Sequence, residues 1–410
     1  MRLLYPLSIS VYSLLIWLLK PFHEKAALLF AGRKNTFHLL QKFKKDQRKL
    51  AWFHCASLGE FEQARPVIEY LKQQKNYQIA VSFFSPSGYE VRKNYALADI
   101  IFYLPADTSQ HAKRVLQLLQ PDMVFIVKYE IWVNYINAIS QQKIPLYLLS
   151  ANFHSNHIYF KWYGKFLRDA LRKFTHVFTQ TTEAENLLRQ FGFSNVVTTG
   201  DTRYDRVLDT ISNPMHLPLV SAFKGANKLI VAGSSYQTEE AILVEALKQF
   251  DALKIVVAPH EIKLERLVEI ENTFKDFSCI RYSEAKEHNV FNYRVLIIDN
   301  IGMLASLYQY ADAAFIGGGF GTKGMHNTLE AAAFGMPVFV GPNNHGRFPE
   351  VEALLRNGSL FVVGQSTSFN QYLDQLWRNE KNWNEIKILS QTFVQKQAGA
   401  TQKVVKFLAE

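Results

Sequence analysis

Short apolar runs alternate with amphipathic segments along most of the chain, and no other feature restricts the fold as strongly. The first series of strand-like runs lies at residues 49–56, 77–84, 99–105, 121–128, 144–151, 176–180 and 195–200. Helix-like segments, for example 64–74 and 109–120, separate these runs. Apolar strands that alternate with helices indicate a parallel sheet covered by helices on both faces.

The alternation lapses at residues 211–224, which contain two prolines and no clear period, and then begins again. The strand-like runs of the second series lie at residues 228–234, 253–260, 295–300, 313–318 and 337–341. We therefore predict an α/β protein of two Rossmann-like domains, at 23–212 and 213–410, that face each other across a cleft. In such sheets, ligands bind where the carboxyl ends of the strands meet the helix N-termini.

A charge-free segment opens the chain, at residues 3–19, and a basic block follows it. The block consists of Lys20, Lys25, Arg33, Lys34, Lys42, Lys44, Lys45, Arg48 and Lys49, opposed only by Glu24 and Asp46. The run is at the short end for a membrane span, and basic neighbours favour the cytoplasmic side and anionic headgroups. We predict a single N-terminal anchor helix at residues 1–22 that spans the bilayer or lies in its interface. A core helix that happens to come first is the alternative; a cleaved signal peptide is disfavoured, because no small-residue cleavage site follows.

The composition excludes several other classes of protein. The only two cysteines, Cys55 and Cys279, exclude a disulfide framework and a cysteine-based zinc site, and they fit a reducing compartment. Cys55 follows His54, but buried packing is a simpler interpretation than a thiol nucleophile. The net charge of +10 comes without a nucleic-acid-binding signature, so we attribute it to a membrane surface rather than to nucleic acid.

Residues 317–324 read GGGFGTKG, and Gly319, Gly321 and Gly324 satisfy the dinucleotide pattern G-x-G-x-x-G. The pattern comes late in the chain, and no acidic residue follows about twenty residues on to bind a ribose, so we do not predict NAD or NADP. A short helix at about 327–334 follows instead, with its N-terminus toward the loop, which favours an anion site. Glu330 then either accepts hydrogen bonds from ribose hydroxyls or is a solvated carboxylate in the first turn.

The segment HCASLGEFE at residues 54–62 reads as the end of a buried strand, a glycine turn and a helix start. Ser57 and Glu60 have the spacing of a capping box. Glu60 therefore either caps the helix or acts chemically at the mouth of the first domain, and the residues alone favour the cap.

Five segments together carry a resemblance to a known family: HCASLGEFEQARPVI, YEIW, GDTRYD, VAPHE and GMHNTLEAAAFGMPVFVGP. They resemble the lipid A-specific 3-deoxy-D-manno-octulosonic acid (Kdo) transferases, a family of GT-B glycosyltransferases. The resemblance implies transfer of Kdo from a CMP-Kdo donor to a lipid A precursor in lipopolysaccharide synthesis, at the cytoplasmic face of the inner membrane. It also implies an acceptor-binding first domain, a CMP-sugar-binding second domain, no cofactor and no catalytic metal; the sequence contains no D-x-D.

The resemblance assigns site residues in both halves. Glu60 falls on the general base, and Glu130 and Arg203 on groups that assist the transition state. The CMP site falls on Pro259, His260, Ile301, Gly302, Met303, Asn327, Thr328, Leu329 and Glu330. For Glu130 the alternative is an ion pair with Lys128 or Arg203, and for Arg203 it is a solvated loop cation. His326 is either a phosphate contact or a turn residue, whereas His54 is expected to be a satisfied residue at the end of a strand.

The chain also departs from the family pattern. His260 stands where the family usually has arginine, Met303 where an acidic residue is common, and Tyr236 where histidine is frequent. Residues 150–157, SANFHSNH, replace a motif that contains arginine and serine. Two alternatives therefore stay open: another GT-B transferase or UDP-sugar epimerase that uses a uridine nucleotide, and a non-catalytic binding protein anchored to a membrane.

Overall fold

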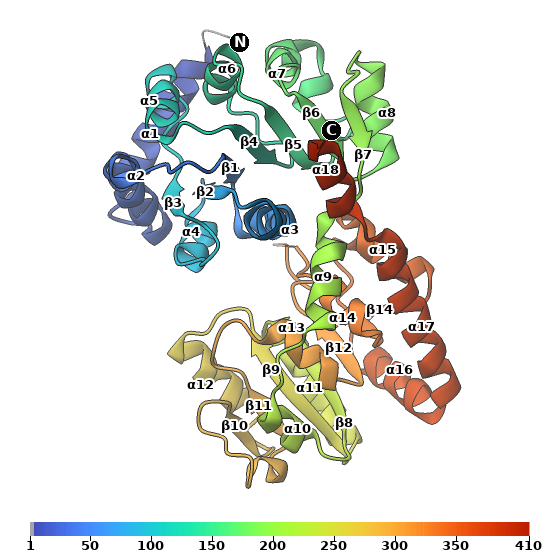
Figure 1. Cartoon of the computed structure of the whole chain (residues 1–410). Helices are drawn as coiled ribbons and strands as arrows, with labels where there is room; N and C mark the ends of the chain where they lie inside the picture. The colour runs from blue at the N-terminus through green and yellow to red at the C-terminus, as the bar shows by residue number, and fades with distance from the viewer. Residues whose placement is uncertain (1–3, 323, 410) are drawn as a thin grey trace. The chain divides into compact units, whose positions relative to one another are not determined.

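The computed structural model describes residues 4–322 and 324–409, which form two α/β units (Figure 1). Unit 1 contains the residues up to Arg206 together with the segment from Ala398 onward, and unit 2 is Val207–Gln397. Each unit is built around one parallel sheet with helices on both faces, which confirms the two predicted Rossmann-like domains.

The sheet of unit 1 has the strand order β3-β2-β1-β4-β5-β6-β7. Its strands are β1 Leu50–Cys55, β2 Gln78–Phe83, β3 Ile100–Tyr103, β4 Met123–Val127, β5 Leu146–Ala151, β6 His176–Thr179 and β7 Val196–Thr198. Its helices include α1 Leu4–Leu19, α2 Glu24–Lys42, α3 Leu58–Lys75, α4 Pro86–Arg92, α5 Ser109–Leu119, α6 Val133–Gln141, α7 Lys165–Leu171, α8 Thr182–Gln190, the start of α9 Thr202–Ser212, and α18 Ala400–Ala409. Every strand-like run of the first series forms one of these strands.

Both faces of the central strand β1 are buried, as expected of a sheet covered on both sides. Ala51 and Phe53 pack with residues of α3 on one face. Leu50 and Trp52 pack with residues of α5 and α6 on the other. Since successive side chains of a strand point to opposite faces, an apolar run without alternation is what this position requires.

The sheet of unit 2 has the order β10-β11-β9-β8-β12-β13-β14. Its strands are β8 Lys228–Ser235, β9 Leu253–Pro259, β10 Cys279–Arg281, β11 Val295–Ile297, β12 Ala313–Ile316, β13 Val338–Val340 and β14 Leu360–Val362. Its helices include α10 Pro218–Lys224, α11 Gln237–Gln249, α12 Leu264–Thr273, α13 Leu304–Leu307, α14 Leu329–Phe334, α15 Pro349–Arg356, α16 Ser366–Arg378 and α17 Glu380–Gln397. The sequence did not indicate β10 or β14, which are the two edge strands of this sheet.

The limits of the units differ from the predicted limit at residues 212 and 213. The chain enters unit 2 after Arg206, within α9, and residues from Ala398 onward return to unit 1. Val404 of α18 lies in the apolar core of unit 1, and the Asp205 carboxylate accepts hydrogen bonds from the backbone of Gly399 (2.5 Å) and Thr401 (2.6 Å). The apolar face of a short helix does not reveal which core it joins, so sequence position placed α18 wrongly in the second domain.

The N-terminal helix α1 is partly packed on unit 1 and largely exposed. Ile16 is buried in a small cluster with Leu29 and Tyr103. Its exposed apolar side chains are Leu7, Val11, Tyr12, Leu14, Leu15, Trp17, Leu18 and Leu19. No single described helix is long and apolar enough to cross a bilayer, whereas Tyr5–Leu19 and Glu24–Lys42, bent by 117°, pass together on length and composition. The membrane anchor remains a prediction.

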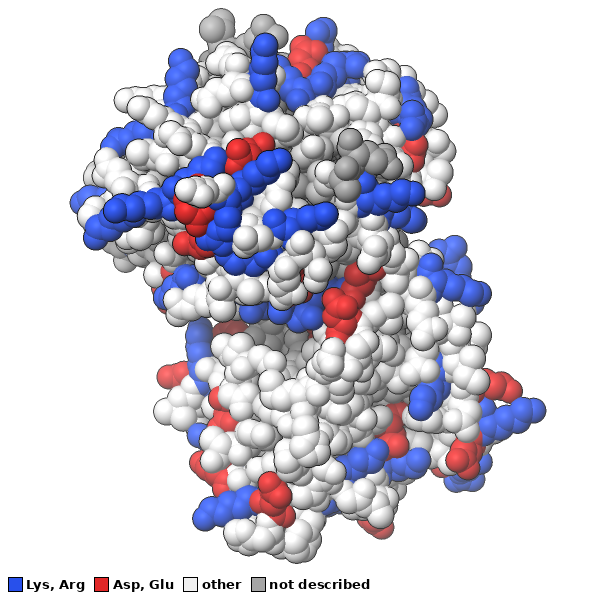
Figure 2. All heavy atoms as spheres, in the orientation of Figure 1, with Lys and Arg blue, Asp and Glu red and all other residues white. Residues whose placement is uncertain are grey.

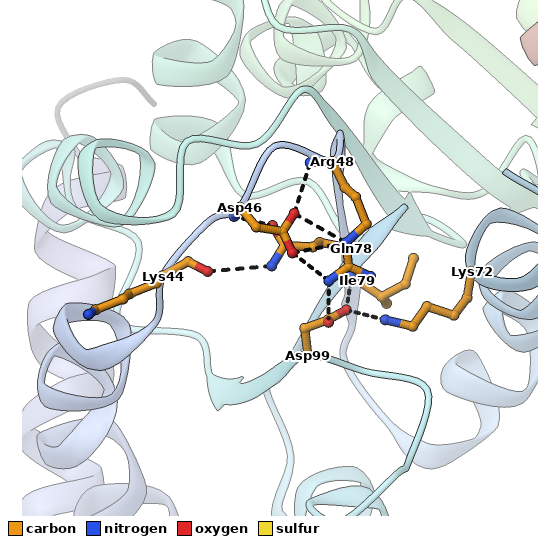
Figure 3. Close-up of polar contacts among 7 residues, drawn as sticks. All are labelled: Lys44, Asp46, Arg48, Lys72, Gln78, Ile79 and Asp99. Atoms are coloured by element: carbon orange, nitrogen blue, oxygen red, sulfur yellow. Dashed lines mark hydrogen bonds and ion pairs between the residues drawn. The ribbon is translucent and has the colours of Figure 1, made fainter. Parts of the chain in front are cut away.

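A polar network holds the amino-terminal edge of the first sheet (Figure 3). The Asp99 carboxylate accepts a 2.7 Å hydrogen bond from the Ile79 backbone and pairs with Lys72 at 2.7 Å and Arg48 at 3.3 Å. The side chain of Gln78 accepts a hydrogen bond from the Asp46 backbone at 2.9 Å. This network fixes the amino-terminal ends of the strands. Ligands bind at the opposite edge of such a sheet, where the carboxyl ends of the strands lie.

Candidate active site

Glu60 lies in the first turn of α3, directly after β1, and only 7% of its surface is exposed. Its Oε2 accepts a hydrogen bond from the backbone N–H of Ala56. Ser57 is the N-cap residue, but its side chain makes no capping hydrogen bond. The predicted capping box is therefore only half formed: the glutamate reaches back to the chain before the helix, and the serine does not cap it.

Glu60 and Glu130 lie at the point where the strand order of the first sheet reverses. β1 is followed in sequence by β2 on one side, while β4 pairs with it on the other. Glu130 comes three residues after β4, and Lys128 between them has a left-handed backbone with φ of 63°. Ligands bind at such reversal points in open α/β sheets.

The electrostatics of this pair suit proton transfer near neutral pH. Burial raises the pKa of Glu60 to about 7, and the charge of Glu130 adds to that shift. The backbone hydrogen bond from Ala56 and the charge of Lys128 oppose it. Burial also raises the pKa of Glu130, again against the charge of Lys128. A carboxylate with a pKa close to 7 accepts a proton more readily than an ordinary glutamate does.

Arg203 stands at the start of α9 in unit 1, held by its neighbour Asp201. Its Nε and Nη2 donate to Oδ2 of Asp201 at 2.9 and 2.7 Å, and its backbone N–H donates to Oδ1 at 2.9 Å. The adjacent Thr202 donates its hydroxyl to the carbonyl of Gln63, at 2.5 Å, one turn beyond Glu60 on α3. Arg203 is thus an oriented, ion-paired side chain rather than a loop cation surrounded by water.

Three amide side chains, each with a buried polar atom, lie on segments linked through Thr202 and the end of β5, and the sequence did not single them out. The Thr202 hydroxyl contacts the Gln63 carbonyl and lies 3.3 Å from the Ser150 hydroxyl. Gln180 joins the same strand end, because its backbone N–H donates to the carbonyl of Ala151 at 2.9 Å. Among the described residues, Gln63 Oε1, Asn152 Oδ1 and Gln180 Nε2 are buried without a hydrogen-bond partner. A buried polar atom without a partner costs about 1–3 kcal/mol, so this arrangement suits a ligand rich in hydroxyl groups.

His54 and Cys55 at the end of β1 are structural. His54 Nδ1 lies 2.9 Å from the Ser82 hydroxyl, and burial lowers the pKa of His54 to about 3. Its Nε2 has no partner within the described part of the chain, so the histidine is satisfied at only one of its ring nitrogens. Cys55 is fully buried, and burial raises the pKa of its thiol. This confirms the packing interpretation.

In unit 2, the predicted CMP-binding residues follow β9, β11 and β12, whose carboxyl ends share one edge of the parallel sheet. Pro259 ends β9, residues 301–303 lie between β11 and α13, and residues 327–330 lead into α14. Helix α14 begins at Leu329 rather than Asn327, because the Asn327 side chain accepts the Leu329 backbone N–H at 3.1 Å. Asn327 also donates to Glu330, at 3.1 Å.

The predicted residues of this edge differ in accessibility. Ile301 has 82% of its surface exposed, whereas Met303 and Thr328 are buried, with 5% and 1% exposed. Among the described residues, Thr328 Oγ1 has no hydrogen-bond partner. Ile301 is therefore open to a ligand, while Met303 packs inside the unit.

Aromatic and imidazole rings stack beside these residues. The rings of His260 and His326 are 4.5 Å apart, and Tyr236 packs on both of them. The Tyr236 hydroxyl lies 3.1 Å from His326 Nε2, and burial lowers the pKa of His326 to about 4. A cavity of about 330 Å³ adjoins the stack, lined by Ser235, Tyr236, Gln237, Thr238, His260, Glu261, Arg266 and Glu269. His326 is thus a neutral packed ring at neutral pH.

The glycines after β12 allow close approach of backbone segments. A Cβ on Gly317 would lie 2.0 Å from the Ser234 carbonyl oxygen, and one on Gly319 would lie 2.4 Å from the Gly341 nitrogen. The Gly318 N–H donates to the Glu239 carboxylate at 2.8 Å. Gly317 and Gly319 therefore have a steric cause, since the backbone at the ends of neighbouring strands lies against them.

Comparison with known proteins shows similarity to one family in particular. A family model described as 3-deoxy-D-manno-octulosonic-acid transferase matches residues 31–206, and this match ends where unit 1 passes into unit 2. A 3-deoxy-D-manno-octulosonic acid transferase of Aquifex aeolicus is 28% identical over 86% of this chain and 93% of its own length. That of Haemophilus influenzae is 24% identical over 87% and 86%. Residues 31–206 and most of the chain are thus similar to Kdo transferases.

The named relatives are glycosyltransferases. Another relative, a bifunctional glycosyltransferase/methyltransferase of Fusobacterium nucleatum, is 24% identical over 90% of this chain, which spans 58% of that protein. Among solved structures, UDP-GlcNAc 2-epimerase of Neisseria meningitidis gives a TM-score of 0.62 at 16% identity, covering 88% and 99% of the two chains. MurG of Acinetobacter baumannii gives 0.52 at 18% identity, covering 88% and 98%. These likenesses show the GT-B fold.

Proposed function

We propose that this Kdo transferase homologue transfers Kdo from CMP-Kdo to a sugar hydroxyl of a lipid A precursor, with Glu60 as the general base. One observation carries the proposal: Glu60 is a buried carboxylate with a pKa raised to about 7, at the reversal point of the first sheet. Such a group is ionised in a large share of molecules at neutral pH and still accepts a proton efficiently.

In the proposed reaction, Glu60 takes the proton of the acceptor hydroxyl as its oxygen attacks the anomeric carbon of Kdo. A bond forms between that oxygen and the anomeric carbon, and the bond from the anomeric carbon to the phosphate oxygen breaks. CMP leaves with the electron pair. Glu130 keeps the pKa of Glu60 high through its charge. Arg203, oriented by Asp201, supplies a fixed positive charge that stabilises the transition state.

Three buried amide atoms in the described part of unit 1 support a carbohydrate acceptor. Gln63, Asn152 and Gln180 each offer a polar atom that sugar hydroxyls complement. We assign CMP to unit 2, to the residues that the resemblance names: Pro259, His260, Ile301, Gly302, Met303, Asn327, Thr328, Leu329 and Glu330. Ile301 offers an exposed apolar surface for the base, and the buried Thr328 hydroxyl offers a donor to a phosphate or ribose oxygen.

The proposed lipid acceptor and the composition of unit 1 support a membrane location. Helix α1 has 16 residues, which span about 24 Å against about 30 Å for the hydrocarbon core. We therefore propose that α1 lies in the interface at the cytoplasmic face of the inner membrane. Unit 1 carries 29 Lys and Arg against 16 Asp and Glu, whereas unit 2 carries 17 against 20. The net positive charge of the protein therefore comes from unit 1, which contains α1.

Incubation of the protein with CMP-Kdo and a lipid A precursor tests the proposal, with mass spectrometry as the readout. The expected product is heavier than the acceptor by one or more Kdo residues. Unchanged acceptor, together with tighter binding of UDP than of CMP, would favour a transferase or epimerase that uses a uridine nucleotide. Binding of CMP without any turnover would leave a non-catalytic binding protein.

A further inference from the structure

A short loop of unit 1 presents large apolar side chains to solvent, far in sequence from α1. It consists of the 3-10 turns η1 Ile158–Phe160 and η2 Trp162–Gly164, directly before α7. Trp162 is 89% exposed, Tyr163 42% and Ile158 39%. The Trp162 and Tyr163 rings pack edge to face with centroids 5.5 Å apart. A fully exposed tryptophan beside two further apolar side chains is unusual on a water-facing surface.

The loop is held in this shape by the rest of unit 1. A Cβ on Gly164 would lie 1.7 Å from the Ile158 carbonyl oxygen, so the two turns close tightly on each other. The Arg168 guanidinium donates to the carbonyl oxygens of Tyr159, at 2.6 Å, and Lys161, at 3.4 Å. Phe160 is buried in the core of unit 1. The fold itself therefore directs Trp162 outward.

Basic residues predominate in the segment that carries the exposed rings. Residues 161–173 contain Lys161, Lys165, Arg168, Arg172 and Lys173, with Asp169 as the single acidic residue. Lys165 keeps 73% of its side chain exposed while pairing with Asp169 at 3.0 Å. Figure 2 shows further Lys and Arg side chains spread over unit 1 on the face drawn there. Tryptophan and tyrosine beside lysine and arginine are typical of protein surfaces that sit in the headgroup region of an anionic bilayer.

The loop is continuous with the start of α1. Tyr5 of α1 packs on Phe166 of α7, with ring centroids 5.4 Å apart. A cavity of about 370 Å³ lies at the same place, lined by residues of α1, α6 and α7. Phe166 follows Trp162 by only four residues, so the loop and the amino end of the apolar helix form one connected region of unit 1.

We propose that residues 158–165 are a second bilayer contact, which inserts Trp162 and Tyr163 among the headgroups of anionic phospholipids. The Tyr159 hydroxyl donates to the carbonyl oxygen of Tyr129, at 2.7 Å, next to Glu130. The loop thus joins the bilayer surface to the part of the chain that carries a candidate catalytic carboxylate. With two contacts, unit 1 is fixed in orientation on the membrane, which one helix alone does not achieve.

Vesicle flotation of the full chain tests this inference. The protein is mixed with vesicles of phosphatidylcholine that contain phosphatidylglycerol, and in parallel with vesicles of phosphatidylcholine alone. We compare the natural protein, the double variant Trp162→Ser/Tyr163→Ser, and Phe291→Ser, which removes a 56% exposed aromatic side chain of unit 2. The double variant should bind the anionic vesicles about tenfold more weakly, since two aromatic side chains no longer enter the interface. Phe291→Ser should bind as the natural protein does.

Two further readouts separate the outcomes. Lipids brominated in the upper acyl chain should quench the fluorescence of the natural protein more strongly than that of Trp162→Phe. The circular dichroism spectrum and melting temperature of the double variant should match those of the natural protein, which shows that it folds. Equal vesicle binding by the natural and double-variant proteins would overturn the inference, as would equal loss with Phe291→Ser. Vesicle binding can be scored without any Kdo transfer, so failure of the proposed function leaves this test intact.

Discussion

The carboxylates of Glu60 and Glu130 follow two paired strands at the reversal point of the first sheet, and the charge of Glu130 adds to burial in raising the pKa of Glu60. Neither residue is close to the other in sequence. Their proximity comes from the parallel pairing of β1 with β4, and it ties the protonation of the candidate base to a second titrating group.

The first prediction is a pH profile. Because the raised pKa of Glu60 is about 7, the carboxylate loses its proton only near neutrality, and kcat/KM for transfer should rise as pH increases through about 7. Glu130→Gln removes the repulsion, so the apparent pKa should fall and the rising limb should move to lower pH. If the rising limb of kcat/KM stays at the same pH in Glu130→Gln, a group other than this pair controls the pH profile.

The second prediction separates the base from the cap. Glu60→Gln keeps an oxygen that can accept the Ala56 N–H but cannot take a proton, so transfer should fall by about 10²–10⁴-fold. The CMP affinity of Glu60→Gln should equal that of the natural protein. Glu69→Gln is the matched control on the same helix, and its rate of transfer should be unchanged. Near-normal transfer by Glu60→Gln would return this residue to a structural role.

The contribution of Glu60 to the free energy of unfolding should fall as pH rises, whereas the rate of transfer should increase. The pKa of Glu60 is higher in the folded protein than the ordinary 4.5, so the folded state holds this proton more tightly than the unfolded chain. This contribution to the free energy of unfolding is fully present below about pH 4.5 and is lost as pH rises through about 7. Glu60→Gln should therefore be more stable than the natural protein at pH 8, measured by thermal unfolding, and the difference should shrink in acid.

The third prediction concerns Arg203 and its partner. Arg203→Ala should lower kcat without weakening CMP binding, because the lost charge acts in the transition state. Asp201→Asn leaves the charge but weakens the ion pair that orients it, so its effect should be smaller and of the same kind. Loss of CMP affinity in Arg203→Ala, with kcat unchanged, would assign Arg203 to donor binding instead.

The fourth prediction addresses the unpartnered amides. Gln63→Leu and Gln180→Leu remove hydrogen-bonding atoms with little change in volume, so KM for the acceptor should rise about tenfold in each while CMP affinity stays constant. If only water meets these atoms, both variants should keep the natural KM for the acceptor.

The fifth prediction concerns the glycine-rich turn. Gly317→Ala places a methyl group against the Ser234 carbonyl, and we expect a loss of about 1–3 kcal/mol in stability together with weaker CMP binding. Gly364→Ala is the control, since a Cβ there meets nothing within 4 Å. Similar melting temperatures for the two variants would argue against tight backbone contact in the turn.

The sequence was informative wherever a local pattern decided the structure. Apolar runs such as 49–56 became strands because both faces of a central parallel strand are buried. The sequence was uninformative where contacts with residues distant in the chain determined the structure. Ser57 and Glu60 had the spacing of a capping box, yet Glu60 accepts a hydrogen bond from Ala56. Its pKa is raised by burial and by the charge of Glu130, which follows another strand.

The same limit applies to packing partners. Helix α18 looks amphipathic in either context, and only Asp205 and the apolar core of unit 1 show where it belongs. Gln63 and Gln180 are ordinary helix and strand-end residues by sequence. Thr202 bonds to the Gln63 carbonyl, and Gln180 bonds to the Ala151 carbonyl at the end of β5, a contact that depends on the pairing of β5 with β6.

The return of α18 to unit 1 has a consequence for biosynthesis. Val404 belongs to the core that surrounds β1, yet the ribosome makes all of unit 2 between these two parts. Domains usually fold in the order of their synthesis, but here the domain begun first is completed only by a helix made after unit 2. The nascent chain therefore holds the first sheet with an uncovered apolar patch until α18 has been made, while unit 2 can already fold.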